Sequence, residues 1–163
     1  MTTLIEKLAG VPPDSKLGAA LKVRAEVLRL SEAAHDAVLV PREPGGLSHA
    51  LRAALASRMC RHLGNAALVA HYDGYLAHGG DAEVAPLALP GGSIGDPRQD
   101  AMARHADMLT LAPREATRGD IEALKAAGVS EPDIVRLSEL AAFVNYQLRV
   151  IAGLMLLKEV EGR

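Results

Sequence analysis

Apolar residues recur every three or four positions along most of this chain, which is the spacing of one face of an α-helix. The longest series lies near the C-terminus and comprises Ile134, Leu137, Ala141, Val144, Leu148, Ile151 and Met155. A second series on another side of the same segment comprises Leu140, Phe143, Val150, Leu154 and Leu157. A helix that is apolar on two sides must be covered on both. The pattern predicts either a central helix of the domain or a helix that also meets a second subunit.

Glycine, proline and capping residues divide the rest of the chain into shorter helices. We predict helices near residues 4–8, 17–39, 48–62, 66–78, 98–111, 117–128 and 130–157. Ser48, Asn65 and Thr117 are the expected N-cap residues, and Gly79-Gly80 is the expected end of the 66–78 helix. Residues 38–40 resemble a strand but are too isolated to form a sheet.

These elements predict an all-α helical bundle of about six or seven helices in a single domain, 1–163. Residues 1–46 would form an N-terminal helical extension to a core of residues 47–163, and residues 88–97 a surface loop or hinge. Hydrophobic residues make up 49% of the chain, but aromatic residues only 2%. We therefore expect a core of Ala, Leu and Val, which suits closely packed helices.

The net charge of the chain limits which binding partners we expect. The net charge is about −2, and no run of Lys and Arg is longer than two, so we expect neither nucleic acid nor a membrane surface as a partner. The first ten residues lack the apolar segment of a signal peptide, and no stretch approaches the roughly 20 apolar residues of a membrane span. The expected location is the cytoplasm.

His71 is the most interesting candidate for chemistry. It lies in the middle of the Ala-rich helix predicted at 66–78, next to Tyr72. One interpretation is a packed histidine with a single hydrogen-bonded nitrogen; the other is a general acid or base, because histidine titrates near neutral pH. His71 and His78 are two helical turns apart, which is too far to share one metal ion without a third ligand. We expect no metal and no cofactor.

Cys60 is the only cysteine, so one subunit can neither close a disulfide nor run dithiol chemistry. Free cysteines are most often buried small hydrophobic residues. The neighbouring Arg58, Arg61 and His62 would lower the pKa of the thiol if it were exposed. Both interpretations of Cys60 remain open at this point.

Residues 64–80 resemble the core helix of the carboxymuconolactone decarboxylase and alkylhydroperoxidase-D-like superfamily. In its peroxidase branch that core has a glutamate, then C-x-x-C-x-x-x-H, and a glycine at the helix end; His71 falls on the histidine and Gly79 on the glycine. Residues 120–154 resemble the closing pair of helices of the family, with its A-A-G turn and F-x-N segment. The first forty or so residues resemble the N-terminal extension of a bacterial subgroup of this superfamily.

The departures from the family pattern decide what the resemblance implies. Gly64 and Ala67 stand at the two cysteine positions, and Arg52 stands near the glutamate position. Peroxidase chemistry of this kind needs a low-pKa thiolate and a resolving thiol, so the redox role does not carry over. The decarboxylase branch keeps a histidine without the cysteine pair, and its chemistry resembles proton transfer next to a carbonyl or lactone.

The resemblance implies an enzyme acting on a small organic acid or lactone, with His71 as acid or base. Tyr72, Tyr75 and Asn145 are the candidate polar neighbours, and Arg52 is the candidate carboxylate clamp. The alternatives are a non-catalytic binding or assembly protein, and a one-cysteine peroxidase that uses Cys60 with an external thiol. Because of the two apolar series, we expect a homo-oligomer, either a homodimer or a trimer of dimers.

Overall fold

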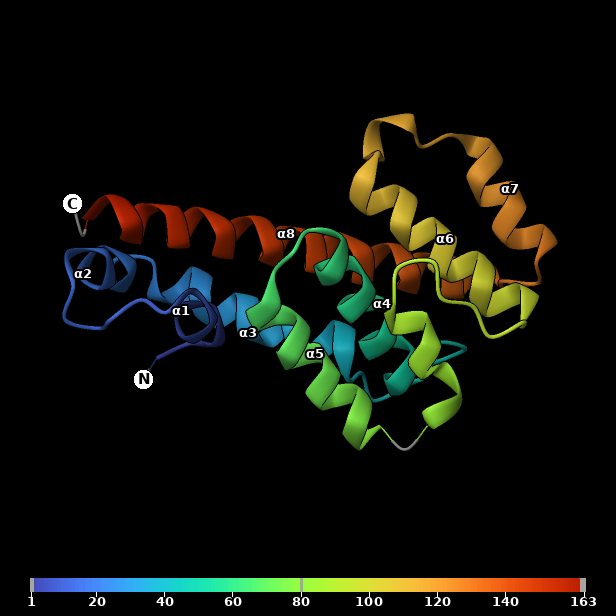
Figure 1. Cartoon of the computed structure of the whole chain (residues 1–163), viewed down its shortest axis with the longest axis horizontal. Helices are drawn as coiled ribbons and strands as arrows, with labels where there is room; N and C mark the ends of the chain where they lie inside the picture. The colour runs from blue at the N-terminus through green and yellow to red at the C-terminus, as the bar shows by residue number, and fades with distance from the viewer. Residues whose placement is uncertain (1, 80, 162–163) are drawn as a thin grey trace.

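The computed structural model describes residues 2–79 and 81–161, and these residues form an all-α bundle (Figure 1). The expected all-α class is confirmed. Eight α-helices and two short 3-10 helices follow one another as α1 (Leu4–Ala9), α2 (Lys16–Lys22), α3 (Ala25–Leu39), α4 (His49–His62), α5 (Ala66–His78), η1 (Ala82–Ala88), α6 (Pro97–Leu111), η2 (Pro113–Glu115), α7 (Arg118–Ala126) and α8 (Glu131–Glu161).

The predicted caps are present. The side chain of Ser48 accepts a hydrogen bond from the Leu51 N–H, and that of Asn65 accepts one from the Leu68 N–H. Thr117 donates its backbone N–H to the Asp120 carboxylate, as a capping box requires. Helix α5 ends at Gly79 as expected, and Gly80 lies outside the described residues.

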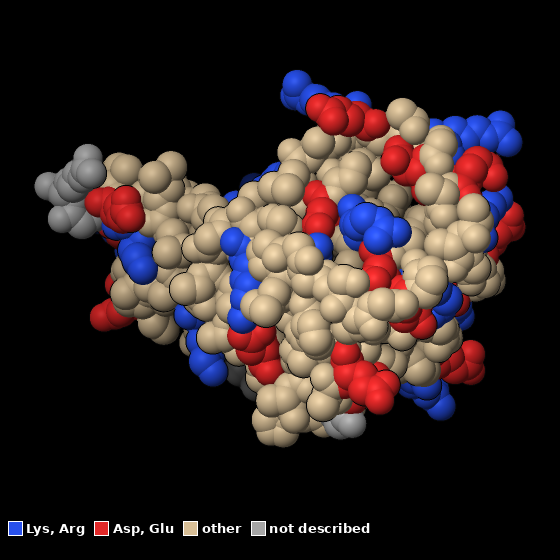
Figure 2. Space-filling model, turned by 45° about the vertical axis from the view of Figure 1, so that its right-hand side comes forward, with Lys and Arg blue, Asp and Glu red and all other residues tan. Residues whose placement is uncertain are grey.

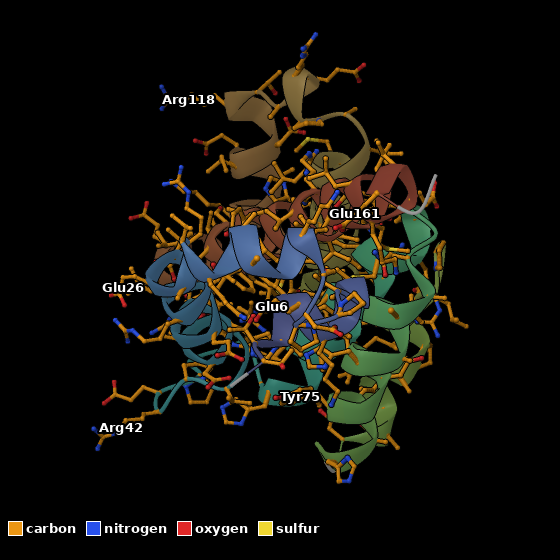
Figure 3. The ribbon with its side chains drawn as sticks, turned by 90° about the vertical axis from the view of Figure 1, so that its left-hand side faces the viewer. Glu6, Glu26, Arg42, Tyr75, Arg118 and Glu161 are labelled. Carbon is orange, nitrogen blue, oxygen red and sulfur yellow. The ribbon has the colours of Figure 1, made fainter. Side chains whose placement is uncertain are left out.

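The block predicted as one helix at 17–39 is instead two helices, which is why the described residues contain eight α-helices. Val23 ends α2 and Arg24 begins α3, so α2 turns back along the C-terminal end of α8. There the carboxylate of Glu161, which is labelled in Figure 3, accepts the Lys16 N–H at the free end of α2. This contact joins residues 145 positions apart in the chain, and no Gly or Pro marks the break at Val23 and Arg24.

Helix α8 runs along nearly the whole length of the molecule, with α1, α2 and α3 at its C-terminal end and α6 and α7 near its start (Figure 1). Of its second apolar series, Leu140 and Leu154 are buried and Phe143 and Val150 are half-buried, while Leu157 is 55% exposed. Helix α8 is thus a central helix of the bundle, and a second subunit on its exposed positions stays a prediction.

Helix α8 is also long and apolar enough to cross a membrane by length and composition alone, with a mean hydropathy of 1.6 over 18 residues. The central helix of a bundle meets the same criterion, and 44% of that window is buried in the protein. Charged side chains of both signs lie interspersed among uncharged ones on the face shown in Figure 2.

The most enclosed helix is α4, in which every residue from Ala50 to Cys60 is buried. Its polar residues are satisfied by hydrogen bonds, as burial requires. Arg58 donates a bidentate pair to the carboxylate of Asp107 on α6, with 2.6 Å for each bond, and its third nitrogen donates to the backbone carbonyls of Leu89 and Gly92. This one side chain ties α6 and the segment after η1 to α4.

Substitution by alanine should change the stability of the fold in opposite directions at two glycines. A Cβ on Gly74, in the exposed middle of α5, would meet no atom within 4 Å, whereas a Cβ on Gly92 would overlap the backbone carbonyl of Pro86. Because alanine is the better helix former, Gly74→Ala should raise the free energy of unfolding by about 1 kcal/mol. Gly92→Ala should lower it by roughly 2 kcal/mol or more.

Urea denaturation at pH 7 measures both changes. Gly153→Ala is the matched control for Gly74→Ala, because a Cβ there is also unobstructed within a helix. A loss of stability in Gly74→Ala would contradict the packing described for α5.

Candidate functional site

His71 lies on α5, and its partner comes from the N-terminal part of the chain. The Nε2 atom of His71 is 2.9 Å from the Nε2 atom of His35 on α3. The Nδ1 atom of His35 is in turn 2.9 Å from the carboxylate of Asp36. His35 is 3% exposed, while the Asp36 side chain is 70% exposed. The three residues form a hydrogen-bonded chain that leads from solvent to His71.

The hydrogen-bond partners of His35 determine which ring nitrogens of the two histidines carry a proton. A carboxylate only accepts hydrogen bonds, so the Nδ1–H of His35 donates to Asp36. A neutral His35 then has an unprotonated Nε2, which accepts the Nε2–H of His71. In this arrangement the Nδ1 atom of His71 is unprotonated and is the basic atom of the pair.

Aromatic rings surround the two imidazoles. The ring of His71 is 5.1 Å from that of Tyr72 and 5.2 Å from that of Tyr75, while Phe143 of α8 lies 6.1 Å from His35. Burial is the largest cause that lowers the pKa of His71 to about 4, and the nearby His35 and Lys7, which disfavour a positive charge on His71, add to it. His71 is therefore neutral at pH 7.

Of the residues predicted to flank His71, two lie beside it with different roles. Tyr72 is buried, and its hydroxyl donates to the Oε1 atom of Gln147 at 2.5 Å. Burial also raises the pKa of Tyr72, so its proton stays in this bond. Tyr75 is only half-buried, and burial and the charge of Asp36 raise the pKa of its hydroxyl. Tyr75 is the phenol that a ligand near His71 could reach.

Arg52 does not act as the expected carboxylate clamp. It is 2% exposed, and its guanidinium donates to the backbone carbonyls of Leu47, Val38 and Pro44 at 2.8 to 3.0 Å. These bonds hold the segment between α3 and α4. All three of its nitrogens are engaged inside the fold, so none faces a substrate.

Cys60 does not support the one-cysteine peroxidase. The residue is fully buried in α4, and burial raises the pKa of its thiol to about 12. A thiolate is the reactive form, so this side chain is an inert part of the core. The positions that resemble the two family cysteines, Gly64 and Ala67, are both exposed and carry no thiol.

Asn145 lies away from His71, where α8 faces α6. Its Nδ2 atom donates to the Ala141 carbonyl at 3.0 Å and to the Thr110 hydroxyl at 3.3 Å. It also lines a cavity of about 480 Å³ between α6, α7 and α8, together with His105 and Arg149. The polar residues proposed from the sequence as one site therefore belong to two places in the fold.

The two places are well separated in Figure 3, where Arg118, at the start of α7 and near the second place, lies at the top and Tyr75 of the first place lies below the centre. The pattern of residues along the chain did not indicate His35 and Asp36 at the first place, or His105 and Arg149 at the second. The only local signal for His35 is its spacing within α3, which brings it to the buried side with Leu28, Ser31 and Leu39.

The described residues contain no group of three or more His, Cys, Asp and Glu side chains placed to hold a metal ion. The two imidazoles therefore have no third ligand among these residues. Their arrangement is suited to moving a proton between two nitrogen atoms.

Comparisons with known proteins found a solved structure with a similar fold. No family model matches the sequence, and no curated protein matches it. A solved structure of an uncharacterized peroxidase-related protein from Silicibacter sp. TM1040 is similar, with a TM-score of 0.66 and 23% sequence identity. The match covers 79% of this chain and 68% of the other. The chain thus has the fold of a peroxidase-related protein.

The lowered pKa of His71 predicts a pH dependence of stability. The unfolded chain binds a proton near pH 6.5, but the folded chain binds it only near pH 4. The contribution of neutral His71 is therefore complete above pH 6.5 and is lost as the pH falls towards 4, on the order of 3 kcal/mol in total. Urea denaturation at pH 7 and pH 4.5 should show a smaller loss in His71→Gln than in the wild type.

Burial also lowers the pKa of His105, so His105 destabilises the folded chain at low pH in the same way. Both the wild type and His71→Gln keep this contribution, and the variant should therefore still lose some stability in acid. The matched control is His78→Gln, because His78 is exposed at the end of α5. An equal acid-induced loss in His71→Gln and His78→Gln would contradict the burial of a neutral His71.

Proposed function

We propose that this chain is a non-redox member of the carboxymuconolactone decarboxylase and alkylhydroperoxidase-D-like superfamily that transfers protons on a small organic acid or lactone. The observation that carries this proposal is the 2.9 Å contact between the Nε2 atoms of His35 and His71. The peroxidase-related fold and the resemblance of residues 64–80 support the family, and Gly64 and Ala67 exclude its dithiol chemistry.

The pair resolves a difficulty that His71 alone would present. A base with a pKa of about 4 is weak at neutral pH. When its Nδ1 atom takes a proton from a substrate, however, its Nε2–H can pass to His35. The positive charge then rests on His35, beside the carboxylate of Asp36. The proton acceptor in this proposal is therefore the hydrogen-bonded pair, in which Asp36 accepts the Nδ1–H of His35.

The substrate class follows from the group that the pair can act on. A proton on a carbon next to a carbonyl is acidified by that carbonyl. Its removal gives an enolate, and return of the proton at another carbon moves a double bond. The half-buried Tyr75 hydroxyl, which keeps its proton at neutral pH, is the donor available to the developing oxyanion.

Exchange with solvent deuterium tests this step directly. Incubation of the full chain with an unsaturated five-membered lactone in D₂O should incorporate deuterium next to the carbonyl, as followed by NMR. His71→Gln should lower the rate at least 100-fold, because it removes the base. His35→Gln should lower it about 10-fold and shift the pH profile, because the charge no longer reaches Asp36.

The control is His78→Gln, which should exchange at the wild-type rate. Equal exchange rates in all three variants would show that His71 takes no part in the reaction. If the wild type exchanges deuterium into several lactones and acids no faster than buffer alone does, the catalytic proposal is overturned.

A second candidate is the non-catalytic binding or assembly protein, and one surface favours it. Val27 and Leu30 on α3 are each 52% exposed, and they line a shallow cavity of about 330 Å³ with Phe143 and Tyr146 of α8. The hydroxyls of Ser31 and Tyr146 are hydrogen-bonded at 2.9 Å beneath this face. A soluble protein rarely leaves such a contiguous apolar face in water. We propose that a second copy covers it, in a homodimer or a trimer of dimers.

Light scattering tests the assembly. The wild type should have a mass at micromolar concentration that is a multiple of 17.1 kDa, and Leu30→Glu should shift it towards the single chain. The matched control is Leu111→Glu on α6, because Leu111 is 56% exposed and lies outside this face. A wild-type mass of one chain, or an unchanged mass in Leu30→Glu, would contradict the pairing of this surface.

A further inference from the structure

The cavity between α6, α7 and α8 has the size of a ligand site. Its volume of about 480 Å³ lies within the range of small-molecule pockets, roughly 300–1,000 Å³. Much of its wall is apolar and includes Leu109, Ile121, Ala141 and Ala142. An apolar wall with a few polar groups is typical of pockets that bind small organic molecules.

Arg149 supplies a positive charge at this cavity. Its Nη1 atom donates to the backbone carbonyl and the Oδ1 atom of Asn145, both at 3.0 Å. It forms no ion pair with any other residue in the described ranges 2–79 and 81–161. Its Nε and Nη2 atoms make no hydrogen bond to those residues either, so two parallel donors are available for a carboxylate.

Asn145 holds this guanidinium from inside the fold. Its Nδ2 atom donates to the Ala141 carbonyl and the Thr110 hydroxyl, so the side-chain oxygen is directed to Arg149. Asn145 is 8% exposed and fixed by both α6 and α8. A guanidinium positioned in advance loses less conformational freedom when it binds an anion.

His105 lies across the same cavity and has no use in the fold that the structure shows. It is 8% exposed, and its ring nitrogens form no hydrogen bond with the described residues. Burial lowers the pKa of His105, so it is neutral at pH 7 and offers one donor and one acceptor. Such a group suits a hydroxyl or carbonyl oxygen rather than a second acid.

We propose that this cavity binds a small monocarboxylate with an apolar body. The carboxylate pairs with Arg149, the body lies against Ala141, Ala142 and Leu109, and a polar group at its far end bonds to His105. This site is separate from the His35–His71 pair, since neither histidine lines the cavity and Tyr75, beside His71, lies well away from the start of α7 in Figure 3. It does not depend on the proton-transfer proposal.

Isothermal titration of the full chain with phenylacetate, cyclohexanecarboxylate and hexanoate tests the site, with phenylacetamide as the neutral counterpart of the first. We expect at least one acid to bind with a dissociation constant below about 1 mM, and phenylacetamide to bind at least 10-fold more weakly than phenylacetate. Arg149→Gln should weaken acid binding at least 10-fold, and Ala142→Phe should abolish it by filling the cavity.

The matched control is Arg118→Gln, since Arg118 is an exposed arginine at the nearby start of α7 that does not line the cavity. Circular dichroism confirms that each variant is folded. The proposal is overturned if none of the three acids binds, or if Arg149→Gln and Ala142→Phe bind as tightly as the wild type. It is also overturned if binding appears only on dilution to the single chain, because a second copy would then occupy the cavity. Arg149→Gln should leave deuterium exchange at the His35–His71 pair unchanged, so the two proposals fail separately.

Discussion

The structure depends on the satisfaction of two guanidinium groups inside the buried part of α4, from Ala50 to Cys60. Arg52 and Arg58 both lie on α4, with every neighbouring position enclosed, and burying an unpaired charge would cost several kcal/mol. Arg52 offsets that cost by donating to three carbonyls between α3 and α4. Arg58 offsets it with Asp107 and the carbonyls after η1. The same bonds place the surrounding elements.

Both candidate sites depend on that placement. Arg52 holds the end of α3, the helix that carries His35 to within hydrogen-bonding distance of His71. Arg58 holds α6, the helix that carries His105 to the cavity with Arg149. Two positively charged residues that touch neither site thus determine the geometry of both.

The side chains present limit the chemistry available to this chain. Helix α5, which carries His71, contains no cysteine that the histidine could activate. A half-buried His71 with a pKa of about 4 is a poor base alone, but its partner His35 lies next to an exposed carboxylate. The similarity to a peroxidase-related protein concerns the fold, and the function follows from the side chains present.

The sequence by itself determined the local structure. Helix ends at Ser48, Asn65, Thr117 and Gly79 were predictable because caps and periodicity act within one turn of the chain. Only the tertiary structure decided that α4 rather than α8 is the most enclosed helix, that Arg52 binds carbonyls, and that His35 meets His71. Those contacts join residues up to 36 positions apart and depend on how helices cross, which the spacing of apolar residues along one helix does not encode. Asn145 shows the same limit, since its sequence environment is unchanged whether it faces His71 or, as the structure shows, a cavity on the other side of α8.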